Sequence, residues 1–210
     1  MESKEVIMVG AGGHALSLAE FAEPLIYGYL ANEENPEMPS QWLGKDDDLA
    51  SWIDAGKKFH MAFVYSGLPV MSKREALIRK YEEAGARFAS LIAPSSIITP
   101  HSEIGEGSAV MAGSIVNRAL LGRNVIVNSG AIVEHDCKVG DNTFIGPGAV
   151  IGGFTSVGSN CFIGLGARIA NGITIASGIT VAMGAIVSRS LTEPGIYHGS
   201  PLRLFKLKNR

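Results

Sequence analysis

The chain has 210 residues, of which 46% are hydrophobic and 18% charged, so it can form a folded core and is not of the disordered class. Its formal net charge of −2 gives no global electrostatic reason to expect nucleic acid as a partner. No apolar run approaches the ~18 residues that span a bilayer, and the first residues lack a signal-peptide layout. Cys137 and Cys161 have no metal-site or redox spacing. We therefore expect a cytoplasmic protein with no membrane span.

Residues 1–90 alternate between short apolar strands and helical patterns. In chain order, the sequence predicts a strand at Val6–Val9, a helix over Ala15–Ala22, a strand near Tyr27–Leu30, a helix over Asp48–Ala55, a strand at Met61–Tyr65 and a helix over Lys73–Ala84. This β-α-β-α-β-α order is typical of a parallel sheet. Because so short a stretch supplies only half of a dinucleotide-binding fold, we expect a small half-Rossmann-like α/β domain at residues 1–90.

A glycine-rich turn, Gly10-Ala11-Gly12-Gly13-His14-Ala15, follows the first predicted strand. Gly10, Gly12 and Ala15 fit the dinucleotide-binding fingerprint, in which amides at a helix N-terminus face a phosphate. The acidic residue expected after the second strand is replaced by Ala31-Asn32. The turn therefore indicates a phosphate-bearing ligand, and a loop that serves only folding is the alternative.

From residue 98 the pattern changes to a period of six residues. Aliphatic residues recur at Leu121, Val127, Val133, Val139, Ile145, Ile151, Val157, Ile163, Ile169, Ile175, Val181 and Val187, after an earlier set at Ile98, Ile104, Val110 and Val116 that is offset by one residue. A helix would need a period of 3.6, and a hairpin array would alternate over longer stretches. The pattern instead predicts a parallel β-helix with three short strands in each coil of about 18 residues. An irregular glycine-rich β-sandwich is the alternative.

The repeat also predicts which side chains lie inside and outside. The small fifth residue of each unit, which includes both cysteines, should pack beside the axis, and the sixth should point outward. The outward residues form three rows: Ile126, Phe144 and Phe162; then Ile132, Val150, Arg168 and Ile186; then Lys138, Ser156 and Thr174. An apolar row beside a polar one indicates that the apolar face is buried, most simply in a homo-oligomer of closed symmetry.

Unbroken hexapeptides such as Ile145-Gly146-Pro147-Gly148-Ala149-Val150 resemble those of the left-handed β-helix acyltransferases. Within that superfamily, the whole chain is similar to the bacterial sugar acetyltransferases, which include sialic acid O-acetyltransferases and N-acetyltransferases of nucleotide-linked 4-amino-sugars. The resemblance rests on the glycine-rich turn, Asn128-Ser129, Glu134-His135-Asp136 and Gly199-Ser200-Pro201-Leu202-Arg203.

This resemblance implies a left-handed β-helix acyltransferase domain at residues 91–191, a tail at 192–210 and a sugar-nucleotide-binding role for residues 1–90. It also implies a homotrimer with active sites between neighbouring subunits. The implied reaction is acetyl transfer from acetyl-CoA, without a metal, to the amine or hydroxyl of a sugar. The sequence leaves the sugar, its nucleotide and the choice between N- and O-acylation open.

His135 is the only histidine inside the regular repeat, and its place in the repeat unit predicts that it lies at a turn. Acyl transfer from a thioester needs a base for the attacking amine or hydroxyl, and an imidazole suits that task near neutral pH. A neighbouring carboxylate can fix its tautomer. By resemblance Asp136 is that carboxylate, and Glu134 is the local rival. No cysteine or serine is paired with a base, so we expect direct attack without an acyl-enzyme.

The resemblance assigns the remaining site residues. Residues near Phe144, Gly153, Leu165 and Met183 would line coenzyme A, although some relatives have a histidine in place of Phe144. Asn128 would belong to the catalytic group. Gly12, Gly13, His14 and Asn32 would contact the substrate's nucleotide, and Ser66-Gly67-Leu68-Pro69 replaces a turn that the family uses there. The basic tail, with Arg203, Lys206, Lys208 and Arg210, could meet coenzyme phosphates or be solvated.

Three other functions compete with this one. A γ-type carbonic anhydrase would need three histidines around zinc, and only His101 and His198 accompany His135 near the repeat. A non-catalytic sugar-nucleotide-binding or scaffolding relative would retain ligand binding without turnover. A nicotinamide oxidoreductase is disfavoured because residues 1–90 are too few for a full dinucleotide-binding domain.

Overall fold

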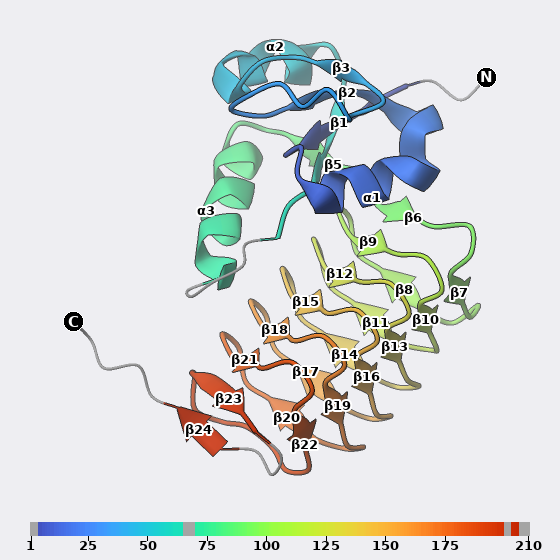
Figure 1. Cartoon of the computed structure of the whole chain (residues 1–210), viewed down its shortest axis with the longest axis vertical. Helices are drawn as coiled ribbons and strands as arrows, with labels where there is room; N and C mark the ends of the chain where they lie inside the picture. The colour runs from blue at the N-terminus through green and yellow to red at the C-terminus, as the bar shows by residue number, and fades with distance from the viewer. Residues whose placement is uncertain (1–3, 65–69, 200–202, 206–210) are drawn as a thin grey trace. The chain divides into compact units, whose positions relative to one another are not determined.

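The computed structural model describes residues 4–64, 70–199 and 203–205, and it divides the chain into two compact units, Met1–Ile92 and Ala93–Arg210. The first is an α/β unit and the second is a β-helix (Figure 1). None of the helices in the described part is long and apolar enough to cross a membrane.

The α/β unit is built on a parallel sheet with strand order β3-β2-β1-β4-β5. Its elements are β1 (Val6–Val9), α1 (Gly13–Ala22), the 3-10 helix η1 (Glu23–Leu25), β2 (Ile26–Leu30), β3 (Gln41–Trp42), the 3-10 helix η2 (Asp46–Asp48), α2 (Leu49–Asp54), β4 (Lys58–Met61), α3 (Val70–Glu83), β5 (Arg87–Phe88) and β6 (Leu91–Ile92). The predicted parallel α/β arrangement is confirmed. Strands β3 and β5 were not predicted, because two-residue strands have no readable periodicity.

The prediction for the third strand of this unit, which corresponds to β4, is wrong in its position. The apolar run suggested Met61–Tyr65, but β4 covers Lys58–Met61 and pairs in register with β1, from Val6 opposite Lys58 to Val9 opposite Met61. The polar residues Lys58 and His60 hid this strand, although His60 is fully buried. Tyr65 lies outside the described residues.

The β-helix has three faces of stacked parallel strands. Face I contains β9 (Ala109–Val110), β12 (Ile126–Val127), β15 (Phe144–Ile145), β18 (Phe162–Ile163), β21 (Thr180–Val181) and β23 (Ile196–His198), and β24 (Arg203–Phe205) adds to it antiparallel. Face II contains β7 (Ile97–Ile98), β10 (Ile115–Val116), β13 (Ile132–Val133), β16 (Val150–Ile151), β19 (Arg168–Ile169) and β22 (Ile186–Val187). Face III contains β8 (Glu103–Ile104), β11 (Leu120–Leu121), β14 (Lys138–Val139), β17 (Ser156–Val157) and β20 (Thr174–Ile175).

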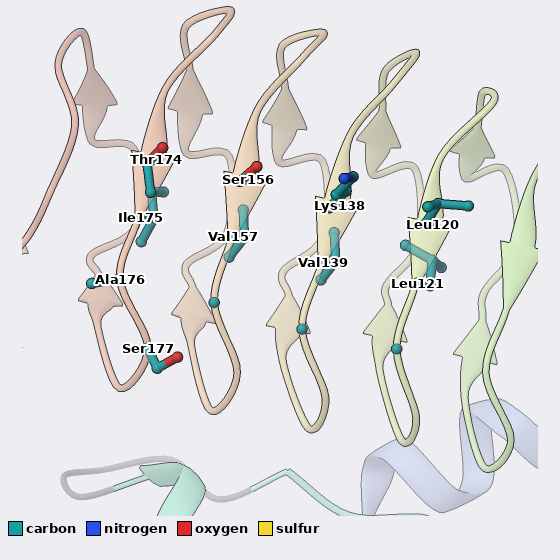
Figure 2. Close-up of a pocket in the computed structure, with 13 residues that line it drawn as sticks. Leu120, Leu121, Lys138, Val139, Ser156, Val157, Thr174, Ile175, Ala176 and Ser177 are labelled. Atoms are coloured by element: carbon teal, nitrogen blue, oxygen red, sulfur yellow. The ribbon is translucent and has the colours of Figure 1, made fainter.

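The predicted inside and outside positions are confirmed. From β9 to β22, the second residue of each strand, such as Val133 or Ile151, is buried in the core, and Cys137 and Cys161 are buried beside it. The predicted outward rows are the strand registers of the three faces. Figure 2 shows one of them, with Lys138, Ser156 and Thr174 on successive strands of face III. The offset of the early repeats arises because one coil is shorter by one residue. Ile115 pairs with Ile132, 17 residues further along the chain, whereas Val150 pairs with Arg168, 18 residues further along.

The expected apolar face differs in one respect. Ile126 and Phe144 on face I are already buried within the single chain, and Phe144 stacks on Phe162 with ring centroids 4.8 Å apart. Face II carries exposed apolar side chains in its strands, where Ile97 is 58% and Ile186 50% exposed. A second copy is therefore not needed to cover face I.

Each coil turns at three corners that use left-handed backbone. The glycine corner, between faces I and II, holds Gly130, Gly148, Gly166 and Gly184; the asparagine corner, between faces III and I, holds Asn124, Asn142 and Asn160; the histidine corner, between faces II and III, holds Arg118, Asp136, Phe154 and Gly172. All of these residues have positive φ. Glycine and asparagine are the residue types that adopt this conformation most readily.

The asparagine corner is expected to be a stabilising ladder. Asn142 has φ 53°, is 5% exposed and donates a 2.7 Å hydrogen bond from Nδ2 to Oδ1 of Asn160. Replacing Asn142 with Ala should lower the free energy of unfolding by about 2–3 kcal/mol, because it removes a buried hydrogen bond and because alanine tolerates left-handed backbone less well than asparagine does. Asn142→Gly should cost about 1 kcal/mol less, because glycine accepts that φ. Denaturant unfolding followed by circular dichroism would measure both; equal losses would contradict the role of backbone strain.

Candidate active site

The sequence Glu134-His135-Asp136 leaves face II after β13 and forms the histidine corner. Asp136 takes the left-handed residue of this corner, with φ 60°, and its amide donates to the carbonyl of Arg118 one coil before. The imidazole is 43% and the carboxylate of Asp136 38% exposed. The predicted position of His135 at a turn and outside the core is confirmed.

His135 and Asp136 are in direct contact. Nδ1 of His135 lies 2.9 Å from Oδ2 of Asp136. The hydrogen bond with His135, helped by the guanidinium of Arg118 at 3.6 Å from Oδ1, holds the pKa of Asp136 below its usual value. An ionised carboxylate only accepts, so Nδ1 carries a proton, and in the neutral imidazole Nε2 is the nitrogen with the free lone pair.

Glu134 contacts the same corner in another way. Its Oε2 accepts hydrogen bonds from the backbone amide of His135 at 3.2 Å and from Nδ2 of Asn117 at 3.0 Å. Of the two candidate acids, Asp136 is the one hydrogen-bonded to the imidazole, while Glu134 holds the backbone of the turn.

The next coil packs a glycine directly against the imidazole. Gly153 faces the ring, and a Cβ at this position would lie 2.8 Å from Nε2 of His135. Phe154, the following residue, packs against the imidazole with ring centroids 5.0 Å apart and planes at 89°. Any side chain at position 153 would therefore displace the ring of His135.

The other predicted coenzyme residues lie at different places. Phe144 is buried on face I, whereas Leu165 and Met183 occupy the glycine corner one coil apart and are 56% and 77% exposed. Asn128 lies next to the same corner, where its Oδ1 accepts from the amide of Ser129 at 2.7 Å. Within one chain, β13 therefore separates Asn128 from His135, and face II lies between Leu165 and the histidine corner.

The α/β unit has a cavity of about 480 Å³ at the carboxyl ends of β1, β2 and β4. Its lining includes Gly10 and Ala11 of the glycine-rich turn, the predicted substrate residue Asn32, and Lys45 and Asp46. Parallel α/β sheets bind their ligands at this edge. Gly12 caps the amino end of α1, Gly13 begins it, and a Cβ on either would meet no atom within 4 Å.

Several side chains of this unit have a buried polar atom without a hydrogen-bond partner in the described part of the chain, and two of them bear on the predicted substrate site. Tyr81 lines the cavity and is fully buried, and its hydroxyl is one of these atoms. Burial, and then the charge of Asp46, raise the pKa of Tyr81 far above its usual range, so the phenol remains a donor. His14, predicted to contact substrate, is not in the lining; its Nε2 is buried and has no hydrogen-bond partner among the described residues.

Other features are less suited to chemistry. A shallow groove of about 530 Å³ runs over face III along Leu120, Lys138, Ser156 and Thr174 (Figure 2), without a catalytic group. In residues 4–64, 70–199 and 203–205, no three His, Cys, Asp or Glu side chains are grouped to hold a metal, as a carbonic anhydrase would need. Residues 66–69, 200–202 and 206–210, which include parts of the predicted motifs, lie outside the described residues.

Several site residues were missed from the sequence. Arg118 and Phe154 stand eighteen residues before and after Asp136, so the coil length would have placed them at the same corner. Lys45, Asp46 and Tyr81 carry no sequence signal, because a loop and a helix bring them to the sheet edge.

Comparisons with known proteins agree with this fold. The family model for the bacterial transferase hexapeptide (six repeats) matches residues 118–153, and that for the hexapeptide repeat of succinyl-transferase matches residues 154–189. Among the curated proteins, no match was found.

Solved structures resemble the chain over nearly its full length. PerB from Caulobacter crescentus, in complex with CoA and GDP-perosamine, is 30% identical, with 96% of this chain and 97% of that chain covered and a TM-score of 0.85. A histidine-to-alanine mutant of GDP-perosamine N-acetyl transferase from the same organism, with the same ligands, is 29% identical with 96% of each chain covered and a TM-score of 0.87. The acetyltransferase domain of PglB from Neisseria gonorrhoeae, with acetyl coenzyme A, is 27% identical, with coverage of 97% and 100% and a TM-score of 0.87.

The β-helix and the full-length similarity define the class of protein, an acyltransferase of the hexapeptide-repeat superfamily with a left-handed parallel β-helix. Within it, the chain belongs to the family of acetyl-CoA-dependent sugar acetyltransferases.

The α/β unit should lose stability in acid. Burial, with the charge of Arg74, lowers the pKa of His14 to about 4, and burial is also the main cause that lowers the pKa of His60 to about 3. Both histidines bind protons more weakly when folded, so the free energy of unfolding should fall as the pH drops below 6.5, by about 1.4 kcal/mol per pH unit for each histidine, until the folded pKa is reached.

Fluorescence of Trp42 and Trp52, the two tryptophans of the chain, reports on this unit. Urea midpoints from pH 8 to 5 should fall for the wild type and much less for the double variant His14→Gln, His60→Gln. Identical slopes would refute the assignment of acid sensitivity to these two rings.

Proposed function

We propose that the chain transfers the acetyl group of acetyl-CoA to the amine of a nucleotide-linked amino-sugar, with His135 as general base. Direct attack without an acyl-enzyme is part of the proposal. So is a cytoplasmic location, in line with the two buried free cysteines. The N-acetyl transferases among the similar structures favour an amine over a hydroxyl as the acceptor.

The observation that carries the proposal is the orientation of His135. Its Nδ1 is occupied by the ionised Asp136, and its ring lies against Gly153, where no side chain takes the place of the imidazole. Nε2 is the ring nitrogen that is left to accept a proton from an acceptor group. The mutated histidine in a similar structure holding CoA and GDP-perosamine supports a histidine in this role.

The proposed reaction follows from this geometry. The acceptor nitrogen attacks the thioester carbonyl carbon, and Nε2 of His135 takes a proton from the nitrogen as the C–N bond forms. The imidazolium is stabilised by the carboxylate of Asp136. The tetrahedral intermediate then collapses, the C–S bond breaks, and the proton passes from the imidazolium to the leaving thiolate of coenzyme A.

The cavity of the α/β unit is the proposed site for the nucleotide. Its volume of about 480 Å³ is within the ~300–1,000 Å³ range of small-molecule sites. Tyr81 offers a buried hydroxyl donor, while Lys45, Asp46 and Asn32 supply a cation, a carboxylate and an amide. Guanine presents adjacent donors and an acceptor, which such a set can pair, and GDP-perosamine is the ligand of a similar structure.

The proposed assembly is a homotrimer that packs through face II. Its exposed apolar side chains, with Ile97 and Ile186 the most exposed, form a surface that a second copy would cover. Face II is bordered by the histidine corner on one side and by the glycine corner on the other. Packing on this face would therefore bring Leu165 and Met183 of one copy towards His135 of the next, with coenzyme A between them.

The first test is thiol release from acetyl-CoA with a panel of GDP-, UDP- and dTDP-linked amino-sugars and neutral sugars. His135→Ala should reduce kcat/KM by at least ~100-fold, because general-base catalysis contributes about 10²–10⁴-fold. Asp136→Asn should reduce kcat by at least ~10-fold, since it no longer fixes the tautomer.

Glu134→Gln is the matched control at the same turn, because it removes a charge without touching the ring nitrogens. It should reduce kcat less than Asp136→Asn. Full activity of His135→Ala would refute the base assignment, and coenzyme binding without turnover on any acceptor would favour the non-catalytic relative.

The assembly makes a separate prediction. Ile186→Glu should convert the trimer to monomers in sedimentation velocity and lower kcat/KM, because it places a charge in an apolar contact. Thr174→Glu, on the exposed face III, should leave both unchanged. A trimer that tolerates Ile186→Glu would show that face II is not the contact.

A further inference from the structure

Phe154 stands where the fold disfavours a large side chain. The four positions of the histidine corner, Arg118, Asp136, Phe154 and Gly172, have φ of 48°, 60°, 62° and 69°. The stacked coils impose this conformation, and glycine at position 172 adopts it without strain. A residue with a Cβ costs roughly 1–2 kcal/mol in left-handed backbone, and a bulky one is a true outlier.

Burial within the chain does not offset that cost. The side chain of Phe154 is 64% exposed, so it has little of the stabilisation that a core phenylalanine gains. Strained residues of this kind cluster at functional sites, where the surrounding structure holds them in place.

The contact that Phe154 makes is with His135. Its ring meets the imidazole edge to face, with centroids 5.0 Å apart and planes at 89°, a favourable aromatic geometry. The imidazole is itself half-exposed, and its Nδ1 donates one hydrogen bond, to Asp136. One hydrogen bond leaves the ring free to pivot about it.

We propose that Phe154 is a positioning residue, which holds the imidazole of His135 in one orientation beside Gly153. The inference rests on the proposed function of His135. Gly153 and Phe154 then have complementary roles: position 153 must lack a side chain so that the imidazole fits against it, and position 154 must carry a ring to stop the imidazole from turning. A misplacement of about 1 Å of a reacting group can reduce a rate ~10²-fold.

Phe154→Gly tests this inference, because it improves the backbone while removing the contact. The variant should fold with an unchanged or higher melting temperature, and kcat should fall by at least ~10-fold with the KM of both substrates unchanged. Phe154→Tyr, which keeps the ring, should retain activity. Asn160→Gly, at the asparagine corner with φ 57°, is the backbone-matched control and should leave kcat unchanged.

Three outcomes would overturn the inference: an unchanged kcat, a rise in acceptor KM alone, which would make Phe154 a substrate contact, or dissociation of the trimer, which would make it a subunit contact. His135→Ala is measured in parallel. If His135→Ala loses turnover while Phe154→Gly is fully active, the assignment of His135 as the base is supported and the positioning role of Phe154 is refuted.

A readout without substrate keeps the two proposals separate. In histidine-labelled protein, nuclear Overhauser contacts between the rings of His135 and Phe154 should be present, and in Phe154→Gly the His135 signals should show averaging between rotamers. Unaltered His135 ring order in the variant would overturn the positioning role, whatever the enzyme's activity.

Discussion

The structure depends on the hydrogen bonding of each short strand to the equivalent strand one coil away. Strands of two residues cannot bend gradually, so the direction of the chain must change within the few residues between them. The turns between strands do this with one residue in left-handed backbone. Because the coils stack in register, such a residue recurs at the same corner in successive coils. The residue types found at a corner therefore indicate which further role that corner has.

The three corners use different residue types for the left-handed position. Glycine fills the corner between faces I and II, and asparagine, whose side chains bond from coil to coil, fills the one between faces III and I. The histidine corner instead holds Arg118 and Phe154 on either side of Asp136, and arginine and phenylalanine are residue types that the left-handed conformation does not favour. All three surround the same imidazole directly or through Asp136. Residues with strained backbone are thus found at the corner that holds the proposed base. Backbone strain of this kind is expected where the residue has a function.

Periodicity made the β-helix, its core and its outward rows predictable, because each depends on local spacing alone. The same argument found His135 at a turn. It did not find that Ile126 and Phe144 are buried within the chain, since a row of outward residues does not reveal what covers it. It also missed β4, where a fully buried histidine interrupts the apolar run. The residues that line the α/β cavity come from separate loops and helices, and their meeting depends on tertiary structure.

The contact between His135 and Asp136 also follows from the corner. Side chains of adjacent residues in a strand point to opposite faces, so neighbours in an extended segment cannot share a hydrogen bond between side chains. The left-handed φ of Asp136 turns its carboxylate back towards the preceding residue, where it reaches Nδ1 at 2.9 Å. The coil before then supplies Arg118 to hold the carboxylate, and the coil after supplies Gly153 and Phe154 around the other side of the ring. The base and its orienting acid are therefore encoded by two adjacent residues, and three stacked coils are enough to complete their surroundings.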